Sequence, residues 1–184
     1  MEIKDKVTKA INKQINAELY SSYLYLAMAA YFEAKTWPGF GHWMRMQAQE
    51  ENAHAMKFFN FVLERGGEVV LEDIKAEEAH WKTPLDVFEA VYAHELKVTA
   101  LINDLLKLAR QENDTATESM LKWFIDEQVE EEANAKQIVD KLKLIKDNSN
   151  GLFMINLWFI VNPDGIEGIV FNGETVKWVV TIEV

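Results

Sequence analysis

Apolar residues recur at alternating steps of three and four along most of the chain, which is the period of an amphipathic helix. The period is sustained over about residues 7–33, 40–65, 84–111 and 115–146. Trp37-Pro38-Gly39 separates the first two segments, and Gly66-Gly67 ends the second. Thr83-Pro84 and Asn113-Asp114 are typical helix starts. The pattern therefore predicts an all-α fold with four long helices.

The connections between these segments predict how the helices are arranged. The first and third connections are short, so helices one and two are antiparallel, as are helices three and four. The middle connection of roughly 15 residues can span ~50 Å when it is extended. A helix of this size is ~40 Å long, so the connection can cross the whole bundle. We therefore expect a four-helix bundle in which one long crossover leaves helices two and three parallel.

The pattern changes after residue 150, so we expect a bundle over residues 1–150 and an atypical tail over residues 151–184. Leu152 to Val161 is almost wholly apolar and fits either a short helix or a buried strand. Beyond a turn at residues 162–165, Ile166 to Val184 has the pattern of a β-hairpin turning at Asn172-Gly173. An isolated hairpin is marginal in water, so it needs a partner surface, and we favour a neighbouring subunit. The alternative partners are its own bundle, cargo or an enclosing shell. The tail would need no partner if it is a foreign appendage.

Composition narrows the classes of function. The chain has 184 residues, of which 49% are apolar and 27% are charged, and it contains no cysteine. Disulfides, thiolate metal sites and cysteine nucleophiles are therefore excluded. The first residues lack the apolar core of a signal peptide, and no run approaches the ~20 apolar residues of a membrane span. A net charge of −11 disfavours nucleic acid and anionic membranes and suits cationic ligands, so we expect a cytoplasmic protein.

Polar residues interrupt each apolar stripe near the middle of its helix. They are Glu18; Glu51 with His54; Glu95; and Gln128 with Glu131. Glu51 and His54 are one turn apart, the Glu-x-x-His spacing of di-iron carboxylate bundles. Alone this motif is weak, because a surface ion pair has the same spacing.

The register of the four helices strengthens the interpretation of a metal site. Midpoints of packed helices lie at the same height, so the six residues should meet in one buried patch. Four buried carboxylates cannot all stay ionised there without cations. Carboxylate oxygens with one imidazole suit iron, and two adjacent metals can share a bridging carboxylate. The alternative is a polar core network that titrates or takes up water.

Other polar residues lie beside this patch. Tyr25 is two turns from Glu18 and is positioned to donate a hydrogen bond or an electron, although a core tyrosine with a satisfied hydroxyl fits as well. Glu50, Glu127 and Glu130 are neighbours of the candidate ligands. They either hold a third cation or form a solvated acidic face.

Four segments carry a resemblance to a known family: Asn16 to Tyr25, Gln49 to Lys57, His94-Glu95, and Trp123 to Glu132. With them, residues 1 to about 150 resemble a bacterial-type non-haem ferritin. The resemblance implies that Glu18, Glu51 and His54 bind one iron and that Glu51 bridges to a second iron, held with Glu95 and assisted by Gln128. It further implies a third iron site at Glu50, Glu127, Glu130 and Glu131. Fe(II) would be oxidised by oxygen or hydrogen peroxide and stored as a ferric mineral in a homo-oligomeric shell of twenty-four subunits.

Three absences separate this chain from related families. Bacterioferritin carries a second Glu-x-x-His on its fourth helix, where Gln128 and Glu131 stand here. Its haem-ligating methionine would fall at Asn52, so we expect no haem. Rubrerythrin-like peroxidases are disfavoured because their cysteine-rich module is missing. A small di-iron oxidase or peroxidase without storage, and a non-catalytic assembly protein acting through its tail, are the alternatives to iron storage.

Overall fold

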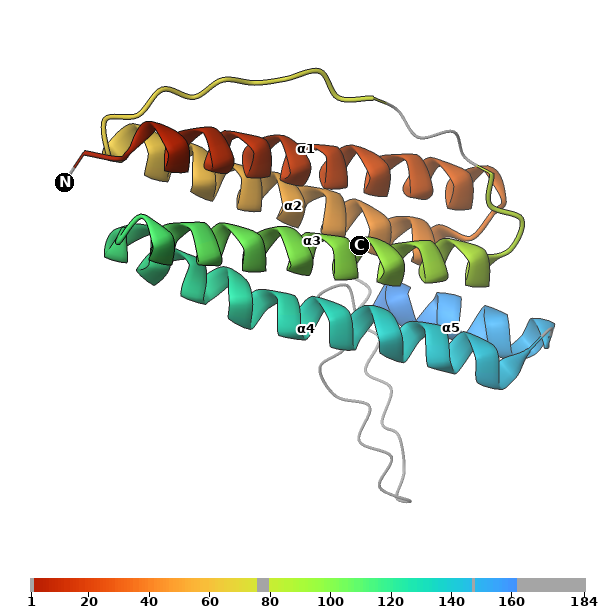
Figure 1. Cartoon of the computed structure of the whole chain (residues 1–184). Helices are drawn as coiled ribbons and strands as arrows, with labels where there is room; N and C mark the ends of the chain where they lie inside the picture. The colour runs from red at the N-terminus through yellow and green to blue at the C-terminus, as the bar shows by residue number, and fades with distance from the viewer. Residues whose placement is uncertain (1, 76–79, 147, 162–184) are drawn as a thin grey trace.

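The computed structural model describes residues 2–75, 80–146 and 148–161, which form five helices and no strand (Figure 1). The helices are α1 (Asp5–Ala34), α2 (Pro38–Glu64), α3 (Pro84–Gln111), α4 (Thr115–Ile145) and α5 (Ser149–Val161). The all-α class is confirmed, and the four long helices begin and end within two residues of the ranges expected from the sequence. No helix in the described ranges is long and apolar enough to cross a membrane.

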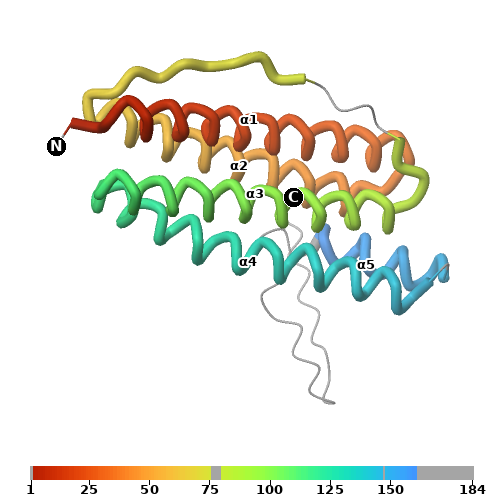
Figure 2. Tube along the Cα trace, in the orientation of Figure 1, coloured from red at the N-terminus to blue at the C-terminus, as the bar shows by residue number. Residues whose placement is uncertain are grey.

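The expected topology with one long crossover is also present. α1 and α2 form one antiparallel pair and α3 and α4 the other, while α2 and α3 run in the same direction (Figure 2). The chain after α2 runs back along α1 towards the start of α3. The buried Asn12 of α1 holds the beginning of this crossover, because its side chain donates to the Glu68 carbonyl (2.9 Å) and accepts from the Val70 amide (3.2 Å).

Local side-chain caps define where the third and fourth helices begin. The Thr83 hydroxyl accepts from the Asp86 amide (3.1 Å) and the Asp86 carboxylate accepts from the Thr83 amide (3.0 Å), which forms a capping box ahead of Pro84. Asp114 accepts from the Thr117 amide (3.0 Å) at the start of α4. Both starts are those that the sequence predicted.

The segment that the sequence left open between helix and strand is helical. It forms α5, which begins at Ser149, just before the expected bundle–tail boundary, and packs against α2 and α4. Phe159 of α5 is 1% exposed and lies among the rings of Phe40 and Trp43, with centroids 5.6 and 5.9 Å away. The hairpin expected over residues 166–184 lies outside the described residues.

The start of α2 is capped by α5 rather than by its own N-cap residue. The buried Asn156 side chain accepts hydrogen bonds from the backbone amides of Gly39 (2.9 Å) and Phe40 (3.1 Å). A Cβ atom at position 39 would come within 1.8 Å of the Asn156 carbonyl oxygen. Only glycine therefore allows α5 to dock this closely.

The interior of the bundle has three layers along its length. One apolar cluster, at the α5 end, includes Met28, Phe32, Phe40, Phe88 and Phe159. A second cluster, at the opposite end, includes Val7, Ile11, Phe58, Ile102 and Phe124. The buried polar residues of the four helix midpoints lie between them. The apolar layers shield this polar layer from water, which strengthens every electrostatic interaction in it.

Candidate metal centre

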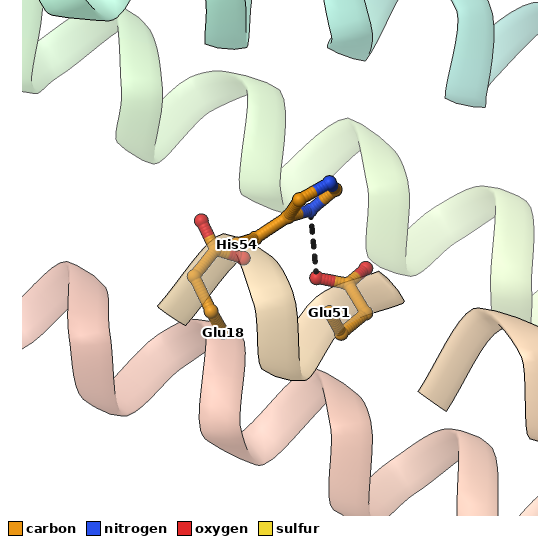
Figure 3. A group of neighbouring side chains, drawn as sticks. All are labelled: Glu18, Glu51 and His54. Atoms are coloured by element: carbon orange, nitrogen blue, oxygen red, sulfur yellow. Dashed lines mark ion pairs between the residues drawn. The ribbon is translucent and has the colours of Figure 1, made fainter. Parts of the chain in front are cut away.

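Glu18 of α1 meets Glu51 and His54 of α2 in the polar layer (Figure 3). Their exposed fractions are 1%, 3% and 4%. One possible ligand atom of each residue lies within 4.8 Å of those of the other two. A single cation placed among the three side chains can therefore reach all of them.

Two carboxylate oxygens in this group have no hydrogen-bond donor among the described residues. Gln14, one turn before Glu18, donates to Glu18 Oε1 (2.9 Å), but the buried Glu18 Oε2 lacks a donor. Glu51 Oε2 is also without one, and it lies 3.5 Å from His54 Nδ1, the contact dashed in Figure 3. Buried acceptors without partners are costly. A bound cation would satisfy both oxygens at once.

The electrostatics of the group also suit a cation. Burial raises the pKa of Glu18 to about 7, against the opposing hydrogen bond from Gln14. Burial raises the pKa of Glu51 well above its usual range, and repulsion from Glu18 and Glu95 adds to the effect. Burial, with the nearby Lys57 charge, lowers the pKa of His54 to about 4. At neutral pH the imidazole is therefore neutral and keeps a lone pair for a metal, while the carboxylates lack the positive charge that would stabilise them.

Glu95 of α3 is the centre of the other half of the layer. Tyr25 of α1 donates to Glu95 Oε1 (2.5 Å), and Gln128 Nε2 of α4 donates to Glu95 Oε2 (3.3 Å). Burial raises the pKa of Glu95, and these two hydrogen bonds oppose the rise. Burial and then the Glu95 charge raise the pKa of Glu131 well above its usual range. Side chains from α1, α3 and α4 thus converge here, as the mid-helix register predicted.

A second group of possible ligand atoms lies beside the first. One atom each from Glu50, His54 and Glu127 falls within 4.8 Å of the others. Glu50 and Glu127 are partly exposed, and burial raises the pKa of each, with added repulsion from the exposed Glu130. Gln47 donates to Glu50 Oε2 (2.7 Å). Glu130 therefore contributes charge to this face without joining the group of ligand atoms.

The sequence interpretation missed two side chains that support the candidate ligands. Gln14 lies four residues before Glu18, and Thr99 lies four residues after Glu95 and within reach of Gln128. Helical spacing of four was the signal that could have found both. Trp123 contacts the His54 ring edge-on, with centroids 5.3 Å apart, and so restricts the orientation of the imidazole.

Comparison with known proteins identifies the family of the chain. The model of the ferritin-like domain family matches residues 8–145. A bacterial non-haem ferritin of Bacteroides fragilis (strain 638R) is 46% identical over 154 residues, which cover 84% of this chain and 96% of the relative. A bacterial non-haem ferritin of Campylobacter jejuni is 39% identical over 149 residues, covering 81% and 89%. An open pore ferritin from the hyperthermophilic archaeon Archaeoglobus fulgidus superposes with a TM-score of 0.84 at 49% identity, covering 85% and 96%. The chain therefore belongs to the ferritin family, and its relatives are bacterial-type non-haem ferritins.

Proposed function

We propose that this iron-storage ferroxidase oxidises Fe(II) at the buried group formed by Glu18, Glu51, His54 and Glu95. The observation that carries the proposal is the pair of donorless oxygens on Glu18 and Glu51, which face a neutral imidazole in a shielded layer. Iron is here the substrate of the protein. Two Fe(II) ions supply the two electrons that, with two protons, reduce one molecule of oxygen to hydrogen peroxide. With hydrogen peroxide as the oxidant, two electrons and two protons reduce one molecule of it to two molecules of water.

The contacts suggest a role for each ligand. Glu18 of α1 and His54 of α2 would bind the first iron from two neighbouring helices. Glu51 would bridge to the second iron, because, in addition to burial, the charges of both Glu18 and Glu95 raise its pKa. It therefore lies between the two halves of the polar layer. Glu95 and Glu131 would supply the second iron with oxygen ligands. Gln128 would assist by donating to Glu95, and Tyr25 would hold the other oxygen of the same carboxylate.

The third iron site of the proposal consists of Glu50, Glu127, Glu130 and Glu131. Its support is the closeness of Glu50 and Glu127 to His54 and the mutual repulsion of these carboxylates, which a cation would relieve. An iron in this partly exposed group would lie next to the buried pair. We propose it as a transit position between the centre and the mineral.

The proposal also covers the assembly and location of the protein. Ferritins are multi-subunit shells, and we propose twenty-four copies of this chain in the cytoplasm. The shell needs subunit contacts, and the described surface of α5 offers exposed apolar side chains for them, including Phe153, Met154 and Ile160. A chain without cysteines is compatible with a reducing compartment.

The decisive experiment combines ferrous oxidation kinetics with size exclusion after iron loading. In Glu51→Ala, loss of the bridging ligand should slow the fast phase of oxidation by about 100-fold or more, while the shell still assembles. Glu64→Ala, an exposed carboxylate on the same helix, is the matched control and should behave as the wild type. Fast oxidation in Glu51→Ala would refute the assignment of the centre.

The same experiment separates the alternative functions. A large assembly that retains far more iron than its ligand groups can bind supports storage. A small oligomer holding about two irons per chain would indicate a di-iron oxidase or peroxidase. A chain that binds no iron would indicate an assembly protein.

A further inference from the structure

A groove of about 400 Å³ between α3 and α4 reaches the second half of the proposed centre. Its lining includes Thr99, Asn103, Gln128 and Glu132. Gln128 is 5% exposed and is the side chain shared by the groove and the centre, because its amide also donates to Glu95. Whatever fixes the Gln128 amide from the groove side therefore acts on Glu95.

Thr99 and Glu132 form a short hydrogen-bonded chain to this amide. The Thr99 hydroxyl donates to Glu132 Oε1 (2.5 Å), and Gln128 Nε2 donates to Thr99 Oγ1 (3.3 Å) as well as to Glu95 Oε2 (3.3 Å). A hydroxyl has one proton to donate and two lone pairs that accept. Because its proton is committed to the Glu132 carboxylate, Thr99 can only accept from Gln128.

The protons available for donation determine which end of the Gln128 amide faces the centre. With the amide reversed, its oxygen would lie against two acceptors, the Glu95 carboxylate and a hydroxyl oxygen without a free proton. Two buried acceptors facing each other without a proton between them are unfavourable. The chain from Glu132 through Thr99 therefore holds the N–H end of Gln128 towards Glu95.

We propose that Thr99 and Glu132 are positioning residues for the ferroxidase centre, which lock Gln128 as a hydrogen-bond donor to Glu95. The inference rests on the proposed function, in which Glu95 binds the second iron. Glu95 is then held on both oxygens, by Tyr25 on Oε1 and by Gln128 on Oε2. A carboxylate has about four lone-pair sites, so both donors can stay in place when a metal binds.

The expected size of the effect follows from the position of Thr99 outside the ligand layer. Loss of a hydrogen-bond partner of a metal ligand typically costs 10–100-fold in metal affinity or activity. Thr99 acts on Glu95 through Gln128, one step further out, so we expect the lower end, about tenfold. The effect should fall on the second metal and spare the first, because Glu18 and His54 have no part in the chain of hydrogen bonds.

The test is an anaerobic titration of metal-free protein with Co(II), followed by its visible absorption, together with the initial rate of ferrous oxidation. Thr99→Val keeps the volume of the side chain and removes the hydroxyl. It should bind the first Co(II) as the wild type does, bind the second about tenfold more weakly and oxidise Fe(II) about tenfold more slowly. Thr99→Ser keeps the hydroxyl, so its affinity for the second Co(II) and its oxidation rate should match those of the wild type. Val129→Ala, which changes an exposed side chain lining the same groove, is the control and should match the wild type.

Glu132→Gln provides an independent test with conserved side-chain volume. The glutamine amide has a donor end as well as an acceptor end, so Thr99 is no longer held to donating towards position 132. Its proton can then turn towards Gln128, which lets the Gln128 amide reverse. This variant should weaken the binding of the second Co(II), but less than Thr99→Val does.

Three outcomes would overturn the inference or its basis. If the affinity for the second Co(II) is unchanged in both Thr99→Val and Glu132→Gln, the positioning role is refuted. Equal weakening of both Co(II) ions, with loss of helical signal, assigns these residues to general packing and also refutes it. A wild-type chain that binds no Co(II) and oxidises no Fe(II) refutes the proposed centre itself.

Discussion

Replacing Glu18 by Gln should stabilise the metal-free protein at neutral pH while removing a proposed metal ligand. Burial raises the pKa of Glu18 from 4.5 to about 7, so the folded chain holds this proton more tightly than the unfolded chain. The carboxylate therefore destabilises the fold increasingly as pH rises above 4.5, and the penalty is complete above pH 7. Glutamine has no such charge, and its Oε1 can accept the same hydrogen bond from Gln14.

The pKa shift sets the magnitude of this effect. One pKa unit corresponds to about 1.4 kcal/mol, so the ionisation of Glu18 costs about 3 kcal/mol at pH 7 and about 1 kcal/mol at pH 5. Glu18→Gln also relieves Glu51, whose pKa is raised in part by the Glu18 charge. For a chain of this length each kcal/mol shifts the melting temperature by about 2–4 °C. We expect the metal-free variant to melt about 6–12 °C higher than the wild type at pH 7, and much closer to it at pH 5.

The assay is thermal unfolding of chelator-treated protein between pH 5 and pH 8, at one protein concentration because assembly makes the melting temperature depend on it. Adding Zn(II) should raise the melting temperature of the wild type, since a metal that binds only the folded state stabilises it by mass action. The same addition should raise that of Glu18→Gln much less. Glu64→Gln, an exposed control, should show neither effect. A metal-free Glu18→Gln protein that is less stable at pH 7, or whose gain is equal at pH 5, would refute the reasoning.

Two further predictions concern the segments after the bundle. Asn156→Ala leaves the buried amides of Gly39 and Phe40 without their acceptor and should lower the free energy of unfolding, measured by thermal unfolding, by about 2–4 kcal/mol. Replacement of the exposed Asn150 by Ala is the control. Equal melting temperatures of the two variants would contradict the cap. Deleting residues 162–184, which carry Phe171 and Trp178, should lower the oligomeric state by light scattering while the helical signal persists. An unchanged shell would refute a role of these residues in assembly.

The helices and the positions of the candidate ligands could be predicted because both follow from local periodicity and simple geometry. The apolar period fixed the four ranges, and the lengths of the connections fixed the directions of the helices. Antiparallel and parallel neighbours alike place their midpoints together. This is why Glu95 of α3 and Gln128 of α4, distant in sequence, were expected in one patch and lie in hydrogen-bond contact.

The features that could not be predicted depend on side-chain contacts between distant elements. A ten-residue apolar run carries no period long enough to separate helix from strand, so α5 was left open. The cap on α2 comes from Asn156, more than one hundred residues away along the chain, and no local signal marks it. The role of Thr99 depends on which partner takes its single proton, and this is decided by the position of Glu132 across the α3–α4 contact.

The two halves of the proposed centre differ in the hydrogen bonds that their carboxylates already accept, which affects how iron would pass through it. In the first half, Glu18 Oε2 and Glu51 Oε2 have no donor among the described side chains, so a cation there gains ligands without breaking a hydrogen bond. In the second half both oxygens of Glu95 already accept from Tyr25 and Gln128. A cation must share those oxygens with their donors, which orient Glu95 for the second metal but leave it fewer free lone pairs than Glu18 and Glu51 have. We therefore expect the second position to bind metal more weakly than the first, which suits a centre that releases iron after oxidation. The difference can be measured as two separated steps in the Co(II) titration, and a second step as tight as the first would contradict this account.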